Sequence, residues 1–385
     1  MLNKTKKHVL IIAGEASGDL HGANLVRAMK RLSPGIDVQG VGGRNMEDAG
    51  VKILVRSSDM AVVGLTEVFS KLYSIMKARH DLKILLRENR PDLLILIDYP
   101  EFNIHLAGAA KRYGIPVLYY ISPQIWAWRR GRLKKIAGRI DRMAVILPFE
   151  KEFYLQAKTE LVVDYVGHPL LDIVPDIPDS RNSKKGPGMP DSYPILGLLP
   201  GSRNDEIRNH LPLMINAAEI LSSRYNKIKC VLPMAPTVSP ELIESTVRQS
   251  LLDISVSSEN IYRVLSICHF AFVASGTATL ETALMEVPMV IVYRVSPLSY
   301  WIGKRVIKVP YVGLVNLIAG KEVVPELIQD EATPQNLAQK AMSVLENEKN
   351  RTDMVKEFRM IRERLGSGGA SERTANIALK MLEPG

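Results

Sequence analysis

The sequence contains very little cysteine: Cys230 and Cys268 are the only two among 385 residues. They are far apart and belong to no paired spacing, so the sequence indicates neither a disulfide framework nor a cysteine-ligated zinc site. Such sparse cysteine is typical of proteins from a reducing compartment. We therefore expect a cytoplasmic protein.

Long apolar runs are also absent. No apolar stretch approaches the ~20 residues that a helix needs to span a bilayer. The N-terminal run HVLIIA (8–13) is short and leads directly into a helical pattern, unlike a secretory signal peptide. Any membrane contact is therefore expected to be peripheral.

The composition that remains is that of a folded protein with basic charge. Apolar residues make up 46% and charged residues 24%, and the length suits two domains of ordinary size. The net charge of +9 favours an anionic partner, which is nucleic acid, a phosphorylated small molecule or an anionic membrane surface. Charge alone does not choose among these partners.

Short runs rich in Val, Ile and Leu alternate with amphipathic helical stretches along most of the chain. This alternation predicts βαβ units, in which buried parallel strands carry helices on both faces of the sheet. The predicted strands are HVLIIA (8–13), DLLILID (92–98), PVLYYIS (116–122), RMAVILP (142–148), ILGLLP (195–200), KIKCVLPMA (227–235), DISVS (253–257), HFAFVAS (269–275) and PMVIVY (288–293).

The domain boundaries follow from a change of composition. Pro, Ser, Gly and charged residues gather at 172–194, which predicts a linker. We therefore expect an α/β fold of two doubly wound, Rossmann-like domains, at 1–171 and 195–340, that face one another across a cleft. The segment 341–385 is helical and highly charged, with a GSGG break at 366–369, and is expected to pack back on the first domain.

An unusually small and polar junction, ASGTATLETAL (274–284), follows the apolar run HFAFV. In a parallel sheet, ligands bind at the carboxyl ends of strands, where a helix N-terminus offers unpaired N–H groups and a positive dipole end. Small residues let a diphosphate approach, hydroxyls can donate to it, and a carboxylate inside the helix can accept from a ribose diol. The alternative is helix capping by Ser or Thr, with the carboxylate supporting the dipole. The residues concerned are Ser275, Gly276, Thr277, Thr279 and Glu281.

A second loop, LLPGSRNDEI (198–207), is predicted at the same edge of the same sheet. It places Gly201, Ser202 and Arg203 after a strand, and Arg203 can offer a bidentate fork to a phosphate oxygen. A surface ion pair is the alternative for Arg203, and Glu206 is expected to cap or pair.

Several longer motifs stand beside these two loops, and with them the chain closely resembles the bacterial lipid-A-disaccharide synthase family. The likeness covers essentially the whole sequence, and WAWRRGRLKKI is more specific than a general nucleotide-binding pattern. The motifs are IIAGEASGDLHGANL (11–25), SPQIWAWRRGRLKKI (122–136), VGHPLLD (166–172), LLPGSRNDEI (198–207) and ASGTATLETAL (274–284).

The resemblance implies an inverting GT-B glycosyltransferase of lipid A and lipopolysaccharide biosynthesis in a Gram-negative bacterium. It would transfer 2,3-diacylglucosamine from UDP to the 6-hydroxyl of 2,3-diacylglucosamine 1-phosphate, giving a β-1,6-linked disaccharide and UDP. The resemblance also implies no metal and no cofactor, and the sequence contains no Asp-x-Asp pair of the kind that holds a divalent ion on a diphosphate. Helix dipole and Arg203 would then stabilise the leaving group. Asn316 is included among the nucleotide-binding residues.

The first domain would then bind the acceptor and hold the general base that inversion requires. Asp98 is the first candidate, because it ends a buried apolar strand where desolvation can raise the pKa of a carboxyl; capping the next helix is its alternative role. Glu15 is the second candidate. Asp19 in the same first loop and His21 are further candidates, although a structural or acceptor-positioning role is favoured for His21, which lies about one turn into a predicted helix. Asn103 is expected to orient the base or the sugar.

Two tryptophans precede a basic run in WAWRRGRLKKIAGR (126–139). Such a run usually forms the solvent-exposed face of a helix. Because the substrate implied by the resemblance is an anionic glycolipid, the alternative is that these residues contact the acceptor phosphate or lipid headgroups. RNA binding uses the same residue types, yet no RNA-binding signature accompanies them, and no nucleic acid partner is expected. The residues assigned to this surface are Trp126, Trp128, Arg129, Arg130, Arg132, Lys134 and Lys135.

A second apolar stretch, 60–86, is interleaved with basic residues. This stretch forms either a core helix or an apolar surface segment that inserts into the bilayer. In the second case, Trp301, Lys304 and Arg305 would extend the membrane-binding surface. The expected working place is the anionic phospholipid surface on the cytoplasmic face of the inner membrane, and a homo-oligomer is allowed. Two other functions remain open: another GT-B enzyme acting on a UDP-sugar (a murein-type N-acetylglucosaminyltransferase or a UDP-sugar epimerase), and a non-catalytic basic protein that binds RNA or membrane.

Overall fold

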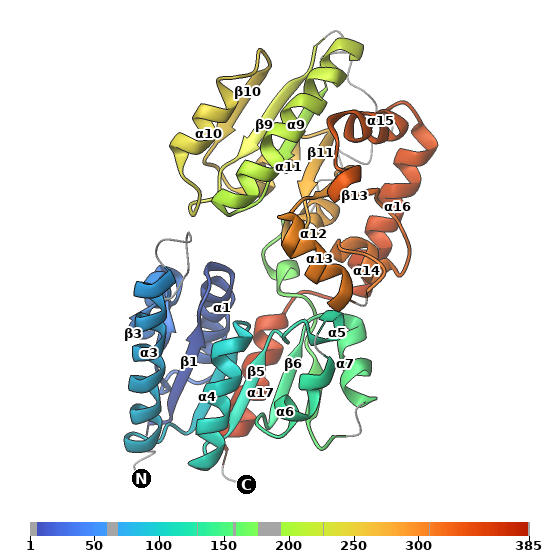
Figure 1. The fold of residues 1–385 in the computed structure, drawn as a ribbon. Coiled ribbons are helices and arrows are strands. Elements are labelled where there is room, and N and C mark those ends of the chain that lie inside the picture. The colour runs from blue at the N-terminus through green and yellow to red at the C-terminus, as the bar shows by residue number, and fades with distance from the viewer. Residues whose placement is uncertain are drawn as a thin grey trace. The chain divides into compact units, whose positions relative to one another are not determined.

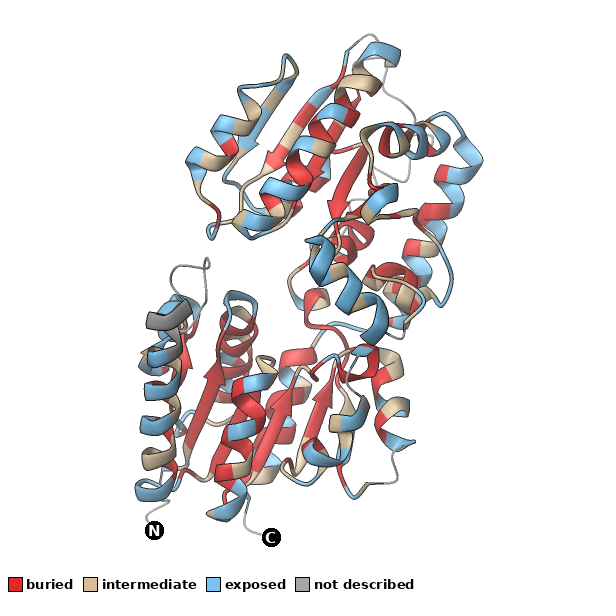
Figure 2. Ribbon diagram, in the orientation of Figure 1, coloured by how far each residue is buried: buried red, intermediate tan, exposed pale blue. Residues whose placement is uncertain are grey.

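The computed structural model describes residues 6–59, 68–128, 130–156, 159–175, 194–225, 227–307 and 309–383. The polypeptide forms two compact units (Figure 1). The first contains Met1–Asp172 together with Leu365–Gly385, and the second contains Ile173–Arg364. In each unit the central strands are buried and the surrounding helices expose one face, as Figure 2 shows.

The first unit is built on one parallel sheet in the order β3-β2-β1-β4-β5-β6-β7. The order in which strands are added reverses between β1 and β4, which makes this pair the topological switch point of the sheet. The strands are β1 (His8–Ala13), β2 (Asp37–Gly42), β3 (Lys52–Arg56), β4 (Leu93–Ile97), β5 (Val117–Tyr120), β6 (Arg142–Val145) and β7 (Val162–Tyr165).

Helices cover both faces of this sheet because successive residues of each strand point to opposite sides. Leu10 and Ile12 of β1 pack into one core with α3 (Val68–Glu88) and α4 (Pro100–Arg112). Val9 and Ile11 pack into the other core with α1 (Ala16–Leu32) and α17 (Ala370–Leu382). Shorter helices join the strands: α2 (Arg44–Asp48), α5 (Ile125–Trp128), α6 (Leu133–Ala137), α7 (Pro148–Leu155), η1 (Ser57–Asp59), η2 (Arg130–Arg132) and η3 (Pro169–Asp172).

The C-terminal segment is divided between the units, which corrects the expectation that all of 341–385 packs on the first domain. Only α17 packs there, along α1. Asp172 holds its N-terminus by accepting hydrogen bonds from the amides of Gly369, Ala370 and Ser371. Arg373 donates to the carbonyl of Val166 at 2.8 Å. The two ends of the motif VGHPLLD thus fasten the returning helix.

The second unit is also a parallel sheet, in the order β10-β9-β8-β11-β12-β13, and its switch point lies between β8 and β11. Its strands are β8 (Ile195–Leu199), β9 (Lys229–Pro233), β10 (Asp253–Ser257), β11 (Phe270–Ala274), β12 (Met289–Tyr293) and β13 (Glu326–Ile328). Its helices are α9 (Asn204–Tyr225), α10 (Pro240–Val247), α11 (Ile261–Ile267), α12 (Thr277–Leu284), α13 (Pro297–Val306), α14 (Leu314–Ala319), α15 (Pro334–Leu345) and α16 (Glu348–Arg364), with η4 (Gln329–Glu331).

Helix α16 belongs to this second unit through both packing and charge. Phe358 and Ile361 are buried. Arg359 forms an ion pair with Glu286 at 2.7 Å, and Arg364 donates to the carbonyl of Ile318 at 2.9 Å. These contacts explain why the chain leaves the second unit only at the glycine-rich turn before α17.

The expectation of two doubly wound Rossmann-like domains is confirmed. Most of the predicted linker, residues 176–193, lies outside the described residues, as does the start of the apolar stretch at 60–67. None of the helices that the structure describes is long and apolar enough to span a bilayer.

Candidate functional site

The first switch point brings two loops together. The register pairs Ala13 of β1 with Ile97 of β4, so Gly14 and Asp98 follow on neighbouring strands. A side chain at Gly14 would place its Cβ 2.4 Å from the Tyr99 ring, so only glycine lets that ring approach the end of β1. Asp98 and Tyr99 both have positive φ, at 44° and 46°, a conformation that non-glycine residues rarely adopt.

The strained turn at Asp98 is held by side chains from two neighbouring elements. Asn103 of α4 donates to the carbonyls of Ile97 and Asp98, at 3.2 Å and 2.7 Å. The hydroxyl of Tyr119 on β5 donates to the same Asp98 carbonyl. Strain of this kind persists only where the surroundings over-determine it, and it gathers at functional sites. Asn103 therefore orients the segment that carries the expected base.

The Asp98 carboxyl has the electrostatics expected of a base. Burial, and then the negative charge of Glu15, raise its pKa to about 6, although the Tyr99 amide opposes the shift by a hydrogen bond. The capping alternative does not describe this residue, because α4 begins at Pro100 and its N-cap is Tyr99. Asp98 thus directly follows β4 and carries a carboxyl with a pKa of about 6.

Glu15 is the exposed N-cap residue of α1, and its side chain forms no capping hydrogen bond. Its carboxylate raises the pKa of the Asp98 carboxyl. The two candidates therefore belong to one electrostatic site, in which Glu15 modulates Asp98.

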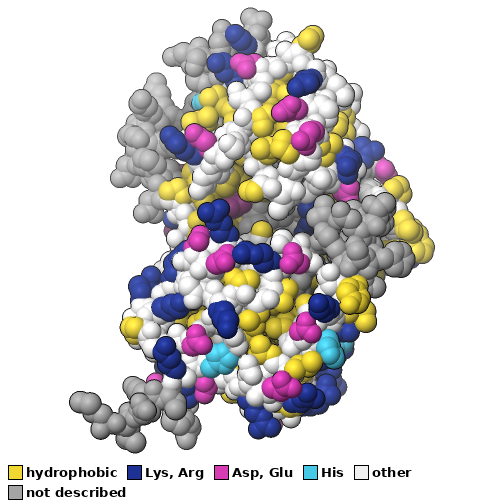
Figure 3. Space-filling model, turned by 90° about the vertical axis from the view of Figure 1, so that its left-hand side faces the viewer, with side chains coloured by type: hydrophobic (Ala, Val, Ile, Leu, Met, Phe, Trp, Pro, Cys, Tyr) yellow, Lys and Arg dark blue, Asp and Glu magenta, His cyan; other side chains and the backbone are white. Residues whose placement is uncertain are grey.

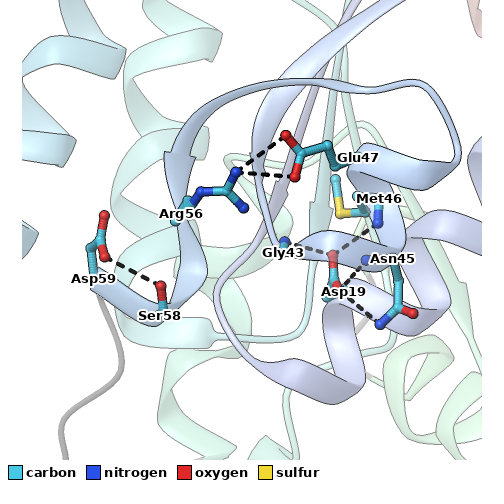
Figure 4. A network of polar contacts seen from close by, with 8 residues as sticks. All are labelled: Asp19, Gly43, Asn45, Met46, Glu47, Arg56, Ser58 and Asp59. Carbon is cyan, nitrogen blue, oxygen red and sulfur yellow. Dashed lines mark hydrogen bonds and ion pairs between the residues drawn. The ribbon is translucent and has the colours of Figure 1, made fainter.

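Asp19, expected at the acceptor surface, holds the chain instead (Figure 4). The buried carboxylate accepts from the amides of Gly43, Asn45 and Met46, and from the side chain of Asn45, at 2.6–3.1 Å. It therefore fixes the start of α2, and four donors leave it little capacity to act on a substrate.

His21 is likewise buried rather than exposed to an acceptor. Burial lowers the pKa of its imidazole to about 4, against a smaller opposing effect of Asp172. The ring is therefore neutral at physiological pH, which favours the structural alternative over an acceptor-positioning role.

The two tryptophans of WAWRRGRLKKI have different environments. Trp126 is buried, packs edge-to-face on Phe149 at 4.9 Å and donates its indole N–H to Glu150 at 3.1 Å. Burial raises the pKa of Glu150 to about 7, despite hydrogen bonds from Trp126 and two backbone amides. Trp126 is thus an anchor of the first unit and not a surface contact, whereas Trp128 is 40% exposed.

The basic residues that follow are mostly turned outward. Arg132 pairs with Glu101 at 2.6 Å, and Lys134 and Lys135 are exposed. Arg129, and the side chain of Arg130, lie outside the described residues.

The second switch point also joins two loops. Val273 of β11 pairs with Leu199 of β8, so Ser275 and Gly201 follow side by side. Helix α12 begins here with Gly276 as its N-cap and no side-chain capping bond, and both Gly276 and Thr277 are exposed. A Cβ at Gly276 would meet nothing within 4 Å. The uncapped N-terminus therefore faces open space and offers its amides to an anion.

The expected roles of two hydroxyls need correction. Ser275 donates its hydroxyl to the carbonyl of Val312 at 2.9 Å, and the buried Thr279 donates to the carbonyl of Gly276 at 2.8 Å. Both bonds shape the loop and are not directed to a ligand. The remaining hydroxyl of this group, on Thr277, lies at the exposed start of the helix.

The loop after β8 has its own carboxylate. Gly201 has φ +122°, which favours glycine. Glu206 accepts from the amides of Ser202 and Arg203 at 2.8 Å and 3.3 Å and pairs with the Arg203 guanidinium at 3.3 Å, as expected for this acid. The surface ion pair that was the alternative for Arg203 is therefore formed, while its side chain remains 71% exposed.

Glu281 lies one turn inside α12 and accepts a hydrogen bond from the Tyr262 hydroxyl at 2.9 Å. Burial raises the pKa of the carboxyl, against that hydrogen bond. No side chain caps α12, so the alternative given in the sequence analysis, capping of this helix by Ser or Thr, is not formed.

Asn316, expected to bind the nucleotide, is wholly buried. Its amide donates to Val324 and Glu326, both at 2.8 Å, and its carbonyl accepts from the amides of Val323 and Val324. Glu326 in turn accepts from the amide of Val312, whose carbonyl receives the Ser275 hydroxyl. Asn316 therefore positions the segment that holds Ser275 before α12, and its side-chain amide is fully used within the second unit.

His210 is a residue that sequence reasoning missed. It is buried in α9, with Nδ1 2.9 Å from the carbonyl of Pro200 and Nε2 accepting from the amide of Arg294. Since Nε2 accepts, Nδ1 carries the proton. The ring thus ties the ends of β8 and β12 together. A histidine on an apolar helix face gives no local signal of this role.

Two Rossmann-like units with polar loops at both switch points define the GT-B fold class. Solved structures with this fold include the UDP-GlcNAc 2-epimerase of Neisseria meningitidis, with a TM-score of 0.67, 12% identity and coverage of 97% of this chain and 100% of that chain. MurG of Acinetobacter baumannii has a TM-score of 0.61, 16% identity and coverage of 97% and 99%.

The sequence comparisons are more specific. The model of the lipid-A-disaccharide synthetase family matches residues 9–379. Lipid-A-disaccharide synthase of Geobacter metallireducens is 48% identical, covering 98% of this chain and 97% of the relative, and that of Coxiella burnetii strain Dugway is 40% identical, covering 98% and 99%. The chain belongs to the lipid-A-disaccharide synthase family and is a glycosyltransferase of lipid A biosynthesis.

Proposed function

We propose that the chain transfers 2,3-diacylglucosamine from UDP to the 6-hydroxyl of 2,3-diacylglucosamine 1-phosphate. The acceptor oxygen forms a bond to C1 of the donor sugar as the bond from C1 to the diphosphate breaks. The hydroxyl proton passes to Asp98, and UDP leaves with the bonding electrons. The products are the β-1,6-linked disaccharide 1-phosphate and UDP.

The observation that carries this proposal is the contrast between the two switch points. Asp98, beside Glu15, provides a carboxyl with a pKa near 6, which suits proton abstraction. The uncapped N-terminus of α12, with Arg203 in the loop after the neighbouring strand β8, suits a diphosphate that gains charge as the leaving group. UDP binding through Glu281 and Thr277 is part of the proposal.

The proposed place of work is an anionic phospholipid surface, on the cytoplasmic face of the inner membrane. Each acyl methylene exposed to water costs ~0.8 kcal/mol, so a lipid-handling enzyme avoids carrying substrates through solution. The exposed Tyr73 and Met76 of α3 support this proposal, because they lie on a helix that also carries Lys77 and Arg79.

The test is an assay with a UDP-diacylglucosamine donor and a diacylglucosamine 1-phosphate acceptor, dispersed in detergent. Disaccharide and UDP should appear together, in equal amounts, and only when both substrates are present. Conversion of a UDP-sugar without an acceptor would instead indicate epimerase chemistry. Transfer of N-acetylglucosamine to a murein-type acceptor would replace the proposal with the other GT-B reaction.

A further inference from the structure

Helix α13 contributes no buried side chain to the second unit. Its ribbon is mainly pale blue in Figure 2. Local signals start it, since Ser296 is the N-cap, accepts from the amide of Ser299 and precedes Pro297. A ten-residue helix is nevertheless marginal in water without packing. The helix therefore lacks the apolar cover that stabilises most short helices.

The apolar residues of α13 fall on one stripe. Leu298, Trp301, Ile302 and Val306 have the spacing i, i+3, i+4, i+8 and are exposed by 68%, 57%, 49% and 36%. Ile307, directly after the helix, is 44% exposed. Large apolar side chains at this spacing form a contiguous surface, which is characteristic of a site covered by an apolar partner.

The charge around the stripe has one sign. No Asp or Glu occurs between Glu286 and Glu322. Lys304 and Arg305 are exposed, and neither pairs with a carboxylate in the part of the chain that the structure describes. On the face seen in Figure 3, by contrast, acidic and basic side chains are interspersed. The α13 segment therefore complements an anionic surface.

The position of Trp301 indicates what kind of anionic surface α13 would contact. The Arg305 guanidinium lies over the Trp301 ring, with Cζ 3.4 Å from its centroid. A tryptophan beside an arginine suits the boundary between lipid headgroups and acyl chains, because the indole ring is partly hydrated there and the guanidinium can contact lipid phosphate. A protein partner of ordinary composition would not require a segment free of carboxylates.

We propose that α13 is an interfacial helix, which inserts Leu298, Trp301 and Ile302 into an anionic lipid surface while Lys304 and Arg305 contact lipid phosphates. This inference rests on the proposed function, because it specifies which part of the second unit meets the membrane. It adds a lipid contact in the second unit, which carries the proposed UDP site, separate from α3 in the first unit.

The test is binding of the full chain to vesicles of phosphatidylglycerol and phosphatidylcholine, measured by flotation. The variant Leu298→Ser/Trp301→Ser/Ile302→Ser should lower the partition coefficient for phosphatidylglycerol vesicles by at least about tenfold. A matched control, Leu251→Ser/Val256→Ser/Ile267→Ser, removes three other exposed apolar residues of the same unit. It should bind as the unchanged chain does.

A second measurement locates the contact. Brominated phosphatidylglycerol should quench tryptophan emission of the unchanged chain, and Trp301→Phe should remove most of that quenching. Lys304→Gln/Arg305→Gln should weaken binding to phosphatidylglycerol and flatten its dependence on salt.

Four results would overturn the inference. First, the α13 variant could bind vesicles as well as the unchanged chain does, and second, the control variant could lose as much binding as the α13 variant. Third, the α13 variant could lose self-association but keep its vesicle binding. Fourth, Trp301 of the unchanged chain could already be shielded from iodide quenching without vesicles. The last two would assign the stripe to a second copy or to the other unit. Turnover in detergent is measured in parallel: the α13 variant should retain it, and its absence in the unchanged chain would refute the proposed reaction instead.

Discussion

The two switch points have the same topology but opposite chemistry. At the first, the loops after β1 and β4 carry Glu15 and Asp98, and the backbone is strained around the carboxyl. At the second, the loops after β8 and β11 carry Arg203 and an uncapped helix N-terminus. Parallel strands deliver loops to one edge in both sheets. The side chains in these loops then determine whether the edge of the sheet suits proton abstraction or anion binding.

The largest expected effect is at Asp98. Asn tolerates positive φ and keeps the shape of the side chain, but it cannot take a proton. Asp98→Asn should therefore reduce kcat by about 10²–10⁴-fold, while UDP affinity and Tm stay near those of the unchanged chain. Steady-state kinetics measures kcat, and calorimetry measures UDP affinity and Tm. Glu15→Gln is the matched control and should cost less; the reverse ranking would move the base to Glu15.

The next effect tests the open helix at the second switch point. Gly276→Asp should cap α12 with its own carboxylate and raise Tm, because Asp is a favoured N-cap residue. The same carboxylate should repel the diphosphate and weaken UDP binding about 10- to 100-fold. Gly276→Ala is the control, since its Cβ meets nothing within 4 Å. Unchanged UDP affinity in Gly276→Asp would mean that these amides bind no phosphate.

A smaller effect is expected one turn inside that helix. Glu281→Ala removes the proposed acceptors of the ribose hydroxyls and should weaken UDP binding by about 1–3 kcal/mol in calorimetry. Tyr262→Phe removes the 2.9 Å hydrogen bond to Glu281 but keeps its charge, and should cost less. If the two variants bind UDP equally well, Glu281 serves the fold and not the nucleotide.

The pH profile links the two carboxylates of the first switch point. The base acts deprotonated, so kcat/KM should rise with pH up to about 6, the pKa of Asp98, and level off above it. Glu15 raises that pKa, so Glu15→Gln should move the acidic limb to lower pH. A profile of kcat/KM against pH for both chains measures the shift. Movement to higher pH would contradict the assigned coupling.

The smallest expected effect is that of a chelator. The α12 amides and Arg203 are assigned the neutralisation of the leaving diphosphate, so excess EDTA should leave turnover unchanged. Turnover that falls with EDTA and returns with magnesium would show that this assignment is incomplete.

Much of the fold follows from local pattern. Continuous apolar runs such as LLILI of β4 are buried on both faces of a parallel sheet, so composition alone identifies them. Strands β2, β3, β7 and β13 were not anticipated. Strand β2 is buried beyond Asp37, but its sequence DVQGVG contains a glutamine and two glycines and lacks a continuous apolar run. The other three are short or partly exposed: β3 alternates exposed and intermediate residues at a sheet edge, β7 has four residues, and β13 has three. Their pairing partners, rather than their own sequences, make them strands.

The sequence by itself determined the two α/β units, the loops at the carboxyl ends of their strands and the family, because apolar periodicity and contiguous motifs are local properties. Only the tertiary structure decided what each polar side chain does. Asp19, Trp126 and Asn316 belong to motifs or loops of the expected site, yet each is buried and makes its hydrogen bonds within its own unit. Asp98 is instead held by neighbours that strain its backbone and raise its pKa. Hydrogen-bond partners and desolvation are properties of the folded chain, so they separate a ligand-facing residue from one that only positions it.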